Sequence, residues 1–301
     1  MSVVLLSGGT GGAKLARGLY DLLGEELTVI ANTGDDIEIH GAYVSPDPDL
    51  VSYWLADRID ERGWGIEGDS FAAMEMLREL GTDVWFALGD RDLAFCLERR
   101  RLLEAGATLS QAHGVLTRAL GVQAQVIPMS DDRVRTMIRS GPQTLSLQEF
   151  LIAHRGASRI DDVTFEGAAQ ASGSPGALAA LDGARAIIIG PSNPIISIGP
   201  IIAIEGIRGA VAASNAPVIA VSPIVAGTVL KGPTAACMAW AGRTADAAGI
   251  AGHYAPLLDA IIADEPVDAL RSLRCDTLMS SPAARRRLAE HTLELAAALS
   301  G

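Results

Sequence analysis

The sequence predicts an α/β fold, a Rossmann-like, mostly parallel sheet flanked by helices with a smaller α+β excursion. Short apolar runs alternate along the chain with segments in which apolar residues recur at helical spacing, as in parallel strands joined by helices. The composition agrees, because 49% of the 301 residues are hydrophobic but only 4% are aromatic, which is typical of aliphatic strands buried on both faces. Four of the apolar runs lead directly into glycine-rich or polar clusters. Ligands bind beyond the carboxyl ends of parallel strands, so we expect these clusters to form one site for a large, phosphate-bearing ligand.

The first half of the chain predicts a regular alternation of strands and helices. Apolar residues at 15, 16, 19, 22 and 23 have helical spacing, and Gly24 ends that helix. Ser110 is expected to cap a later helix that ends at Gly121. The strands are expected over 3–6, 27–31, 84–88 and 124–127, and the helices over 13–23, 49–59, 69–80, 93–104 and 110–121.

The alternation of strand and helix patterns is interrupted over about 130–182. We expect this part to form an α+β excursion inserted in a single α/β domain spanning 1–301. Gly141 and Pro142 predict a turn between two strands, and Pro175 after Ser174 predicts a helix start. The strands of the excursion are expected over 134–139, 144–148 and 162–166. The alternation then resumes with strands over 186–189 and 218–221 and a closing helix over 282–299.

Composition and charge exclude several classes of function. A net charge of −12 argues against a general nucleic-acid binder, which is normally basic. The three cysteines lie far apart and form no CxxC pair, so neither a zinc site nor a disulfide framework is expected. No signal peptide is expected, and prolines and charges interrupt the apolar stretch 195–225 before it reaches the ~20 residues of a membrane span. We therefore expect a cytoplasmic protein without nucleic-acid or membrane partners, and a homodimer formed through an apolar surface around 195–230.

The first cluster is a glycine-rich loop between a strand and a helix, made of Gly8, Gly9, Thr10, Gly11 and Gly12. Backbone N–H groups at the start of a helix bind phosphate, with help from the helix dipole, so the loop is a candidate nucleotide site. Lys14 is not followed by Ser or Thr and stands where GxGxxG has its last glycine, so the loop matches neither a Walker A motif nor the dinucleotide fingerprint. The alternative is a tight turn that lets the helix pack closely.

The second cluster is acidic, with Asp35 and Asp36 after one strand and Asp47 and Asp49 in a short segment stiffened by prolines. Magnesium is typically held by one or two carboxylates together with substrate phosphates and water, so we expect at least one of these side chains to bind metal. One alternative is that Asp35, about 20 residues beyond the glycine loop, binds a ribose hydroxyl. The other is turn and helix-cap chemistry, which we expect for Asp47.

The third and fourth clusters offer an arginine and a polar turn. Arg91 can clamp an anion or stack on a flat ring, and Asp90 and Asp92 are expected to hold it by charge pairing. The alternative for this cluster is a surface salt-bridge turn. Ser192 and Asn193, on a turn bounded by prolines, can contact a purine edge, and the alternative there is a plain turn. The five histidines show no metal-binding spacing, so structural roles are expected for them.

Taken in order along the chain, these clusters resemble those of the 2-phospho-L-lactate transferase family of coenzyme F-420 biosynthesis. The match is carried by residues 7–14, 32–41, 45–49, 88–92, 190–201 and 213–227. The resemblance implies a transferase that joins a phosphorylated three-carbon acid to a deazaflavin alcohol, 7,8-didemethyl-8-hydroxy-5-deazariboflavin. It further implies a guanosine diphosphate-type donor, release of GMP and a requirement for Mg2+. Members of the family differ in the acid, which is phospholactyl, phosphoenolpyruvyl or phosphoglyceryl.

The resemblance also implies residue roles. Asp49 and Arg91 would bind the deazaflavin, and the loop at 8–12 and the turn at 192–193 would lie near the nucleotide. Asp36 or Asp49 would hold the Mg2+ that bridges the donor diphosphate, which makes these two aspartates the expected catalytic and metal-binding residues. The ribityl hydroxyl would attack in line, and a nearby aspartate can take its proton. The part after Lys231 is less similar and carries no implied role.

Two other functions are compatible with such a fold. A non-catalytic regulator that binds a nucleotide or a nucleotide sugar needs the glycine loop but no metal-binding acids. Asp36 and Asp49 therefore favour the enzyme. An NAD-dependent dehydrogenase is disfavoured because the dinucleotide fingerprint is absent.

Overall fold

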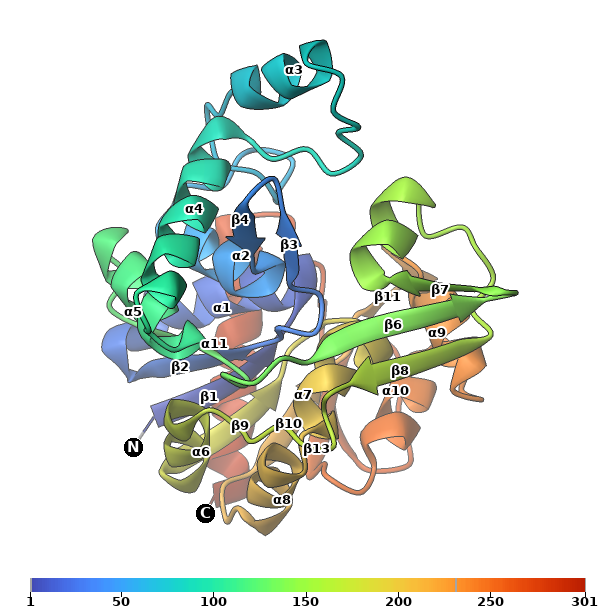
Figure 1. Cartoon of the computed structure of the whole chain (residues 1–301). Helices are drawn as coiled ribbons and strands as arrows, with labels where there is room; N and C mark the ends of the chain where they lie inside the picture. The colour runs from blue at the N-terminus through green and yellow to red at the C-terminus, as the bar shows by residue number, and fades with distance from the viewer. Residues whose placement is uncertain (1, 231, 301) are drawn as a thin grey trace.

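The computed structural model describes residues 2–230 and 232–300. Its centre is a seven-stranded parallel sheet in the order β14-β13-β10-β9-β1-β2-β5 with helices packed on it (Figure 1), so the expected α/β fold is confirmed. The strands of this sheet are β1 Ser2–Ser7, β2 Leu27–Ala31, β5 Gln125–Pro128, β9 Ala184–Ile189, β10 Val218–Val221, β13 Ala260–Ala263 and β14 Arg271–Arg274.

The sheet is buried because its central strands are aliphatic throughout. β1 lies between β2 and β9 and pairs in parallel with both, so that Leu5 is opposite Val29 and Ile188. Side chains alternate between the two faces of a strand, and accordingly Leu5 joins one hydrophobic cluster and Val4 the other. This burial on two sides is the physical origin of the uninterrupted apolar runs in the sequence.

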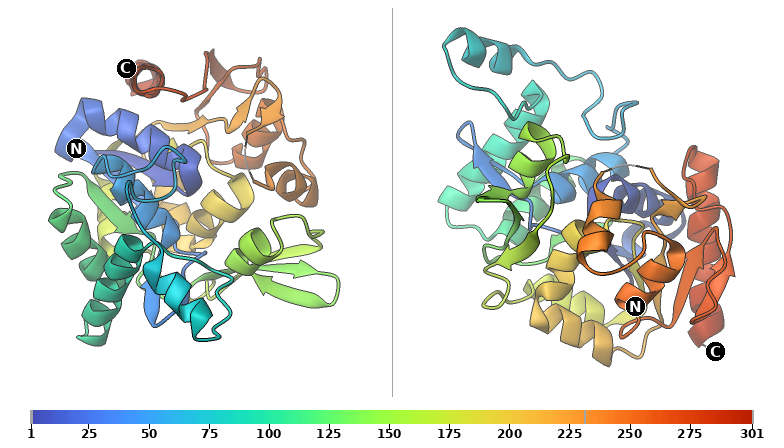
Figure 2. Two further views of the ribbon diagram at one scale, coloured as in Figure 1. Left: turned by 90° about the horizontal axis from the view of Figure 1, so that it is seen from above. Right: turned by 90° about the vertical axis from the view of Figure 1, so that its right-hand side faces the viewer.

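Two groups of helices cover the two faces of the sheet, as the views of Figure 2 show. The helices are α1 Gly9–Leu23, α2 Pro46–Leu55, α3 Ala72–Glu79, α4 Asp90–Glu104, α5 Leu109–Ala119, α6 Pro175–Asp182, α7 Gly199–Ala203, α8 Glu205–Ala213, α9 Thr234–Trp240, α10 Ala247–Tyr254 and α11 Pro282–Ser300. α1, α2 and α11 contribute to the cluster around Leu5, whereas α6, α7, α8 and α10 contribute to the cluster around Val4. The start of α1 and the start of α2 therefore approach the same edge of the sheet.

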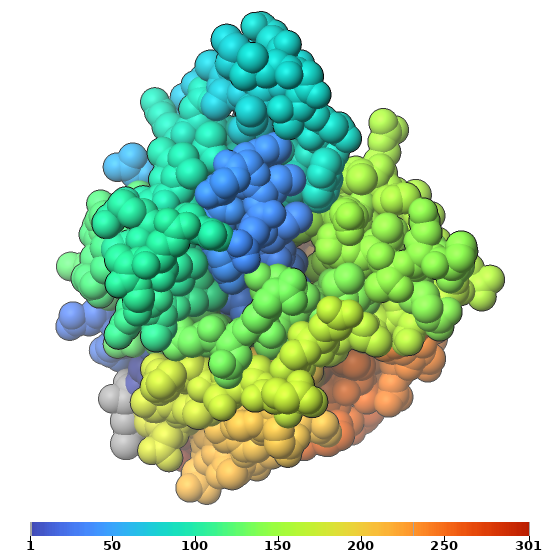
Figure 3. Space-filling view, in the orientation of Figure 1, coloured from blue at the N-terminus to red at the C-terminus, as the bar shows by residue number. Residues whose placement is uncertain are grey.

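Three smaller antiparallel sheets lie outside the main one. β6 Arg135–Ser140, β7 Gln143–Ser146 and β8 Asp162–Glu166 form the largest, in the order β7-β6-β8, and confirm the three strands expected there. The others are the hairpin of β3 Ile37–Ile39 and β4 Ala42–Val44, and the pair β11 Ile224–Val225 and β12 Thr228–Val229. Short helical turns complete the chain at η1 Gly24–Glu26, η2 Glu149–Ala153 and η3 Pro194–Ile198. The face drawn in Figure 3 is hollowed between the blue segment that holds the β3–β4 hairpin and the green β6–β8 sheet.

The predicted strand over 84–88 is wrong. This segment forms no strand in the described chain, and the place beside β2 at the edge of the main sheet belongs to β5. Phe86 and Leu88 pack instead against Val44 of the hairpin and Cys96 of α4. A short apolar run can be buried in this way without pairing, so its composition did not distinguish the two outcomes.

Several boundaries also differ from the predicted ones. α1 begins at Gly9, because the glycine loop is itself the first turn of the helix. α2 covers 46–55 rather than 49–59, with Pro46 at its first position. Thr108, not Ser110, caps α5, through reciprocal bonds with Gln111. The strands β13 and β14 and the helices α7 to α10 were not expected.

No single helix in the described ranges combines the length and the apolar composition needed to cross a membrane. Only together do Pro194–Ala203 and Glu205–Ala213 satisfy that test, and they are bent by 88° relative to each other.

Candidate active site

Four aspartates lie together where β2, the β3–β4 hairpin and α2 meet, and we call them the acidic cluster. Asp35 and Asp36 follow β2, and Asp47 and Asp49 lie in the first turn of α2. None of the four is more than 9% exposed. Two acidic segments separated in the sequence are thus brought to one buried place at the carboxyl end of the sheet.

Asn32 joins two of these aspartates. Its side-chain amide donates to Asp35 Oδ1 at 3.2 Å and to Asp47 Oδ2 at 3.0 Å, while its Oδ1 accepts from the backbone N–H of Gly34 at 2.7 Å. The other oxygen of Asp47 accepts from the backbone N–H of Gly9 at 2.5 Å. Asp47 therefore provides the cap chemistry expected for it, but it does so at the start of α1, a helix distant in sequence, while Ser45 is the N-cap of α2.

Two side-chain hydrogen bonds hold the Asp36 carboxylate, and a third contact supports one of the donors. Ser45 Oγ donates to Oδ1 at 2.8 Å, and Tyr43 of β4 donates to Oδ2 at 3.0 Å. Arg135 of β6 donates to the Tyr43 hydroxyl at 3.3 Å, so the small sheet contributes to the site. The position of Asp36 therefore depends on contacts that local sequence patterns do not predict.

The positive charge around the acidic cluster does not compensate for the burial and the mutual repulsion of its carboxylates. Burial and the charges of Asp47 and Asp36 raise the pKa of Asp35 well above its usual value. Burial raises the pKa of Asp36 to about 7, although Arg135 opposes the change, and raises the pKa of Asp47 to about 6. Hard divalent cations prefer such oxygen ligands. Asn32 holds Asp35 and Asp47 close together, but within the described ranges the ligand atoms of Asp35, Asp36 and Asp47 do not all come within 4.8 Å of one another.

Asp49 lies in a different setting, because the guanidinium of Arg99 pairs with both of its carboxylate oxygens. Arg99 is completely buried and also donates to the Tyr43 carbonyl at 2.9 Å. His113 Nδ1 is 3.8 Å from Asp49 Oδ1, and burial and Arg99 lower the pKa of that histidine, which keeps it neutral. Asp49 is therefore already paired with a guanidinium at both oxygens, whereas Asp35 and Asp36 experience the charge of Arg135 without a direct hydrogen bond from it in the part of the chain that the structure describes.

Sequence reasoning missed Arg99. It belongs to the run Arg99-Arg100-Arg101 of α4, and the other two pair with glutamates at the surface. Nothing in the local pattern separates the buried arginine from its neighbours, because its partner lies 50 residues away in the chain.

The glycine loop packs tightly on the turn that follows β9. A Cβ atom at Gly11 would lie 1.9 Å from the Pro191 carbonyl oxygen, and one at Gly12 would lie 2.3 Å from Ser7 Oγ. The N–H of Gly8 is 3.4 Å from Ser192 Oγ. The first and fourth clusters therefore meet, and close packing of the helix accounts for two of the glycines.

The loop also presents unused backbone donors. Within the ranges that the structure describes, the N–H groups of Thr10 and Gly11 have no hydrogen-bond partner, and both residues are partly exposed. The dipole of the 15-residue helix α1 adds positive potential there. An anion such as a phosphate can bind at this point, but Asp47 at Gly9 would repel it unless a cation lay between them.

Asn193 has a structural task in the fourth cluster. Its Oδ1 accepts from the N–H groups of Ile195 and Ile196 at 2.9 and 3.2 Å, which caps η3, and its amide donates to Thr234 Oγ1 of α9 at 3.2 Å. Both ends of the side chain are thus engaged. Nucleotide contact by Ser192 and Asn193 stays a prediction.

The third cluster begins α4 and is held differently from what was expected. Arg91 is exposed, and its guanidinium donates to the Glu67 carbonyl at 2.8 Å. Asp90 accepts from the N–H of Ala73 at the start of α3 at 2.9 Å, and Asp92 accepts from the Tyr53 hydroxyl at 2.8 Å. The expected charge pairing of Arg91 with its neighbours is wrong, because backbone and phenol donors hold both aspartates.

Asp92 connects the third cluster to the second. Ligand atoms of Asp49, Asp92 and Cys96 lie within 4.8 Å of one another, and burial with the charge of Asp49 raises the pKa of Asp92 to about 6. Arg99 approaches both Asp49 and Cys96, so this group already holds a cation and does not fit a metal. The acidic cluster, the glycine loop and the start of α4 form the candidate active site.

Over nearly its whole length the chain is similar to one group of transferases. Residues 3–283 match the family described as 2-phospho-L-lactate transferase CofD. The chain is 39% identical over 299 residues to a 2-phospho-L-lactate transferase of Methanosarcina mazei, which covers 96% of this chain and 98% of that protein. It is 40% identical over 207 residues to a phosphoenolpyruvate transferase of Kitasatospora aureofaciens, which covers 66% of this chain and 64% of that protein.

A solved structure shares the architecture. A member of the UPF0052 family from Bacillus halodurans has a TM-score of 0.64 at 16% identity, and the match covers 97% of this chain and 98% of that one. At this identity the likeness concerns the fold alone.

Proposed function

The chain belongs to the 2-phospho-L-lactate transferase family of coenzyme F-420 biosynthesis, and from its site we propose the reaction that it catalyses. It transfers a phosphorylated three-carbon acid from a guanosine diphosphate-type donor to 7,8-didemethyl-8-hydroxy-5-deazariboflavin and releases GMP. The acid is phospholactyl, phosphoenolpyruvyl or phosphoglyceryl. The relatives named above carry two of these possibilities in their names, 2-phospho-L-lactate and phosphoenolpyruvate.

One observation carries the proposal: Asp47, one of three buried aspartates with raised pKa values, lies beside unused N–H groups at the start of α1 and is joined through Asn32 to Asp35. A phosphate at Thr10 and Gly11 would face the negative charge of Asp47. A magnesium ion would neutralise that charge together with the charge on the donor diphosphate and on the leaving GMP. Asp35, Asp36 and Asp47 would hold this ion.

Asp49 takes a different part in the proposal. Our sequence-based prediction that it binds metal requires its carboxylate to leave Arg99, which holds both oxygens. We favour its other predicted role, contact with the deazaflavin together with Arg91. Asp92, next to Asp49, lines a small cavity of about 40 Å3 that Trp64 also borders, and Trp64 is 58% exposed. A flat heterocycle can stack on such an indole or on the Arg91 guanidinium.

The transfer itself is a displacement at phosphorus. The ribityl hydroxyl oxygen of the acceptor forms a bond to the phosphorus of the phosphorylated acid, and the bond from that phosphorus to the GMP oxygen breaks. GMP leaves with the electron pair, and the hydroxyl proton passes to a carboxylate. A nearby aspartate that does not hold the magnesium ion can accept it.

We also propose that the protein works in the cytoplasm as a homodimer and binds small molecules rather than nucleic acid or membranes. The net charge of −12 supports the exclusion of nucleic acid. Leu230, at 56% exposure, is an apolar side chain in the region where we expected a dimer contact.

Product analysis by mass spectrometry tests the proposal. The protein is incubated with the deazaflavin alcohol, Mg2+ and each of the three guanosine conjugates in turn. We expect one conjugate to give a deazaflavin phosphodiester together with an equal amount of GMP. Binding of the nucleotide without product from any conjugate would favour a non-catalytic regulator instead.

A further inference from the structure

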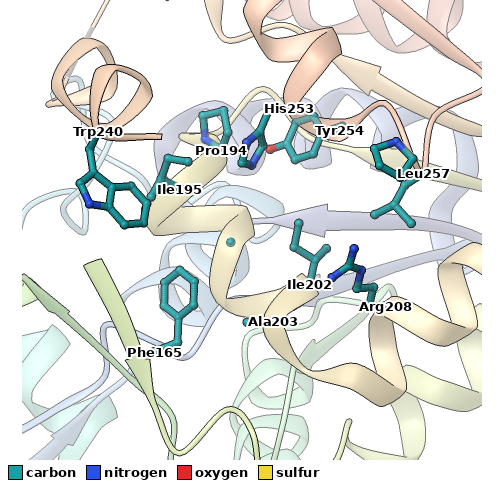
Figure 4. Close-up of a pocket in the computed structure, with 12 residues that line it drawn as sticks. Phe165, Pro194, Ile195, Ile202, Ala203, Arg208, Trp240, His253, Tyr254 and Leu257 are labelled. Carbon is teal, nitrogen blue, oxygen red and sulfur yellow. The ribbon is translucent and has the colours of Figure 1, made fainter. Parts of the chain in front are cut away.

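A cavity of about 340 Å3 lies between the small β6–β8 sheet and the helices of the main domain (Figure 4). Residues of β8, η3, α7, α8, α9 and α10 line it, and none of its lining residues belongs to the acidic cluster or to the glycine loop. Its volume lies in the range of small-molecule sites. The proposed transfer reaction assigns no ligand to it.

The walls of the cavity are mostly apolar. Phe165 of β8 faces Ile202 of α7 across it, with Trp240 at one end and Leu257 at the other (Figure 4). Gly199 permits this arrangement, because a Cβ atom there would lie only 2.9 Å from the Phe165 ring. The cavity is thus formed where the small sheet meets α7, and it suits an apolar group.

One side of the cavity carries an unpaired positive charge. Arg208 of α8 makes no ion pair or hydrogen bond to any part of the described chain, although the protein is acidic overall. Figure 4 shows its guanidinium directed toward the cavity between Ile202 and Leu257. A free guanidinium beside apolar walls favours a carboxylate or sulfonate that carries an apolar body.

Two further polar groups lie in the opposite wall. Burial lowers the pKa of His253, so its ring is neutral at pH 7 and adds no second charge. The hydroxyl of Tyr254 is buried without a hydrogen-bond partner among the described residues. Buried polar groups normally have a hydrogen-bond partner, and the Tyr254 hydroxyl in this wall is an exception.

We propose that this cavity is a second binding site, for a small organic anion with an aliphatic or aromatic body. Arg208 binds the anionic group, and the walls formed by Phe165, Ile202 and Leu257 enclose the apolar part. The cavity shares no lining residue with the acidic cluster or the glycine loop, although Pro194 and Ile195 directly follow Asn193 of the predicted nucleotide turn. Binding of the organic anion does not depend on the transfer reaction.

Calorimetric titration with octanoate and with octanamide tests the proposal, because the two probes share one chain and differ in charge. We expect octanoate to bind about tenfold or more tightly than octanamide. Arg208→Met should remove that difference, and Ala203→Phe, which fills the cavity, should abolish binding of both probes. Arg78→Met is the matched control, since Arg78 is an exposed arginine of α3 that does not line the cavity, and it should bind both probes as the parent protein does.

Equal binding of the two probes, or an Arg208→Met variant that still prefers octanoate, would overturn the proposal. So would sedimentation showing that Ala203→Phe dissociates a dimer, because this face would then be a contact between two copies of the chain. Circular dichroism confirms that each variant is folded before it is compared.

Discussion

Replacing Arg99 by methionine should destabilise the protein strongly and in a pH-dependent way. Methionine has a similar length and keeps the packing, but it removes the guanidinium that is paired with Asp49. Both side chains are buried, Arg99 at 0% and Asp49 at 3% exposure, so water cannot replace the lost partner. The variant leaves a buried carboxylate without a compensating charge.

The size of the effect follows from this burial. Breaking a buried ion pair from one side costs about 3–5 kcal/mol, and for a chain of this length each kcal/mol lowers Tm by about 2 °C. We therefore expect Tm to fall by about 6–10 °C at pH 8. Burial already raises the pKa of Asp49, and without Arg99 it rises further. A carboxyl group with a raised folded-state pKa stabilises the fold below its unfolded pKa and loses that contribution as pH rises, so the deficit should shrink at pH 5.

Thermal melting at pH 5 and pH 8 measures both parts of the prediction. The double variant Arg99→Met with Asp49→Asn removes both charges and should recover part of the loss at pH 8. Asp49→Asn alone leaves Arg99 buried and unpaired, so a loss of activity in that single variant does not assign a catalytic role to Asp49. The double-mutant cycle separates the stability of the pair from the chemistry of the carboxylate.

Arg100→Met provides the matched control. Arg100 is the next residue of the same helix, and it pairs with Glu38 and Glu104 at the surface. Exposed ion pairs contribute little to stability because solvent screens them, so the Tm of this variant should change by no more than about 2 °C. If Arg99→Met melts like this control at both pH values, the buried pair of Arg99 and Asp49 does not stabilise the fold.

The remaining predictions concern metal, acceptor and loop. Added Mg2+ should raise Tm more at pH 8 than at pH 5. The pKa values of Asp36 and Asp47 are raised to about 7 and about 6, so these carboxylates destabilise the metal-free fold as they ionise with rising pH. An equal rise in Tm at both pH values, or none, would contradict a metal site at these carboxylates. Arg91→Lys and Arg91→Ala should weaken deazaflavin binding to a similar extent, measured by the fluorescence of the deazaflavin, while GDP binding persists. The reason is that an ammonium neither stacks on a ring nor binds an anion through two parallel hydrogen bonds. Full deazaflavin affinity in the lysine variant would show that Arg91 acts only as a point charge. Gly11→Ala should lower Tm by several degrees, since its Cβ would lie 1.9 Å from the Pro191 carbonyl oxygen; an unchanged Tm would show that the loop is free to move.

The central architecture could be read from local pattern because burial on both faces of a parallel sheet demands it. Strands such as β1 and β9 are uninterrupted aliphatic runs, and the helices between them repeat apolar residues at helical spacing. The strand β14 escaped prediction because its sequence, Arg271-Ser272-Leu273-Arg274, is mostly polar and only one of its edges is paired. Local pattern thus predicted β1, β2, β5, β9 and β10, and it missed the buried aliphatic strand β13 as well as the polar edge strand β14.

The placement of the acids was predictable in outline, and their partners were not. Clusters after parallel strands come to the same edge, which brought Asp35 and Asp47 within reach of one amide, that of Asn32. The third cluster reached the site without the predicted strand, through the contact of Asp92 with Tyr53. Its position came from helix packing rather than from the sheet.

Residue type and spacing along the chain thus established the fold class, the glycine loop and the supply of carboxylates at one edge. The folded chain alone selected Arg99 from three adjacent arginines, directed Asp47 to the start of α1 and set the pKa values of the cluster. The physical reason is distance in sequence. Propensity and periodicity act within a few turns, whereas ion pairing, desolvation and capping here join residues 38 to 50 positions apart.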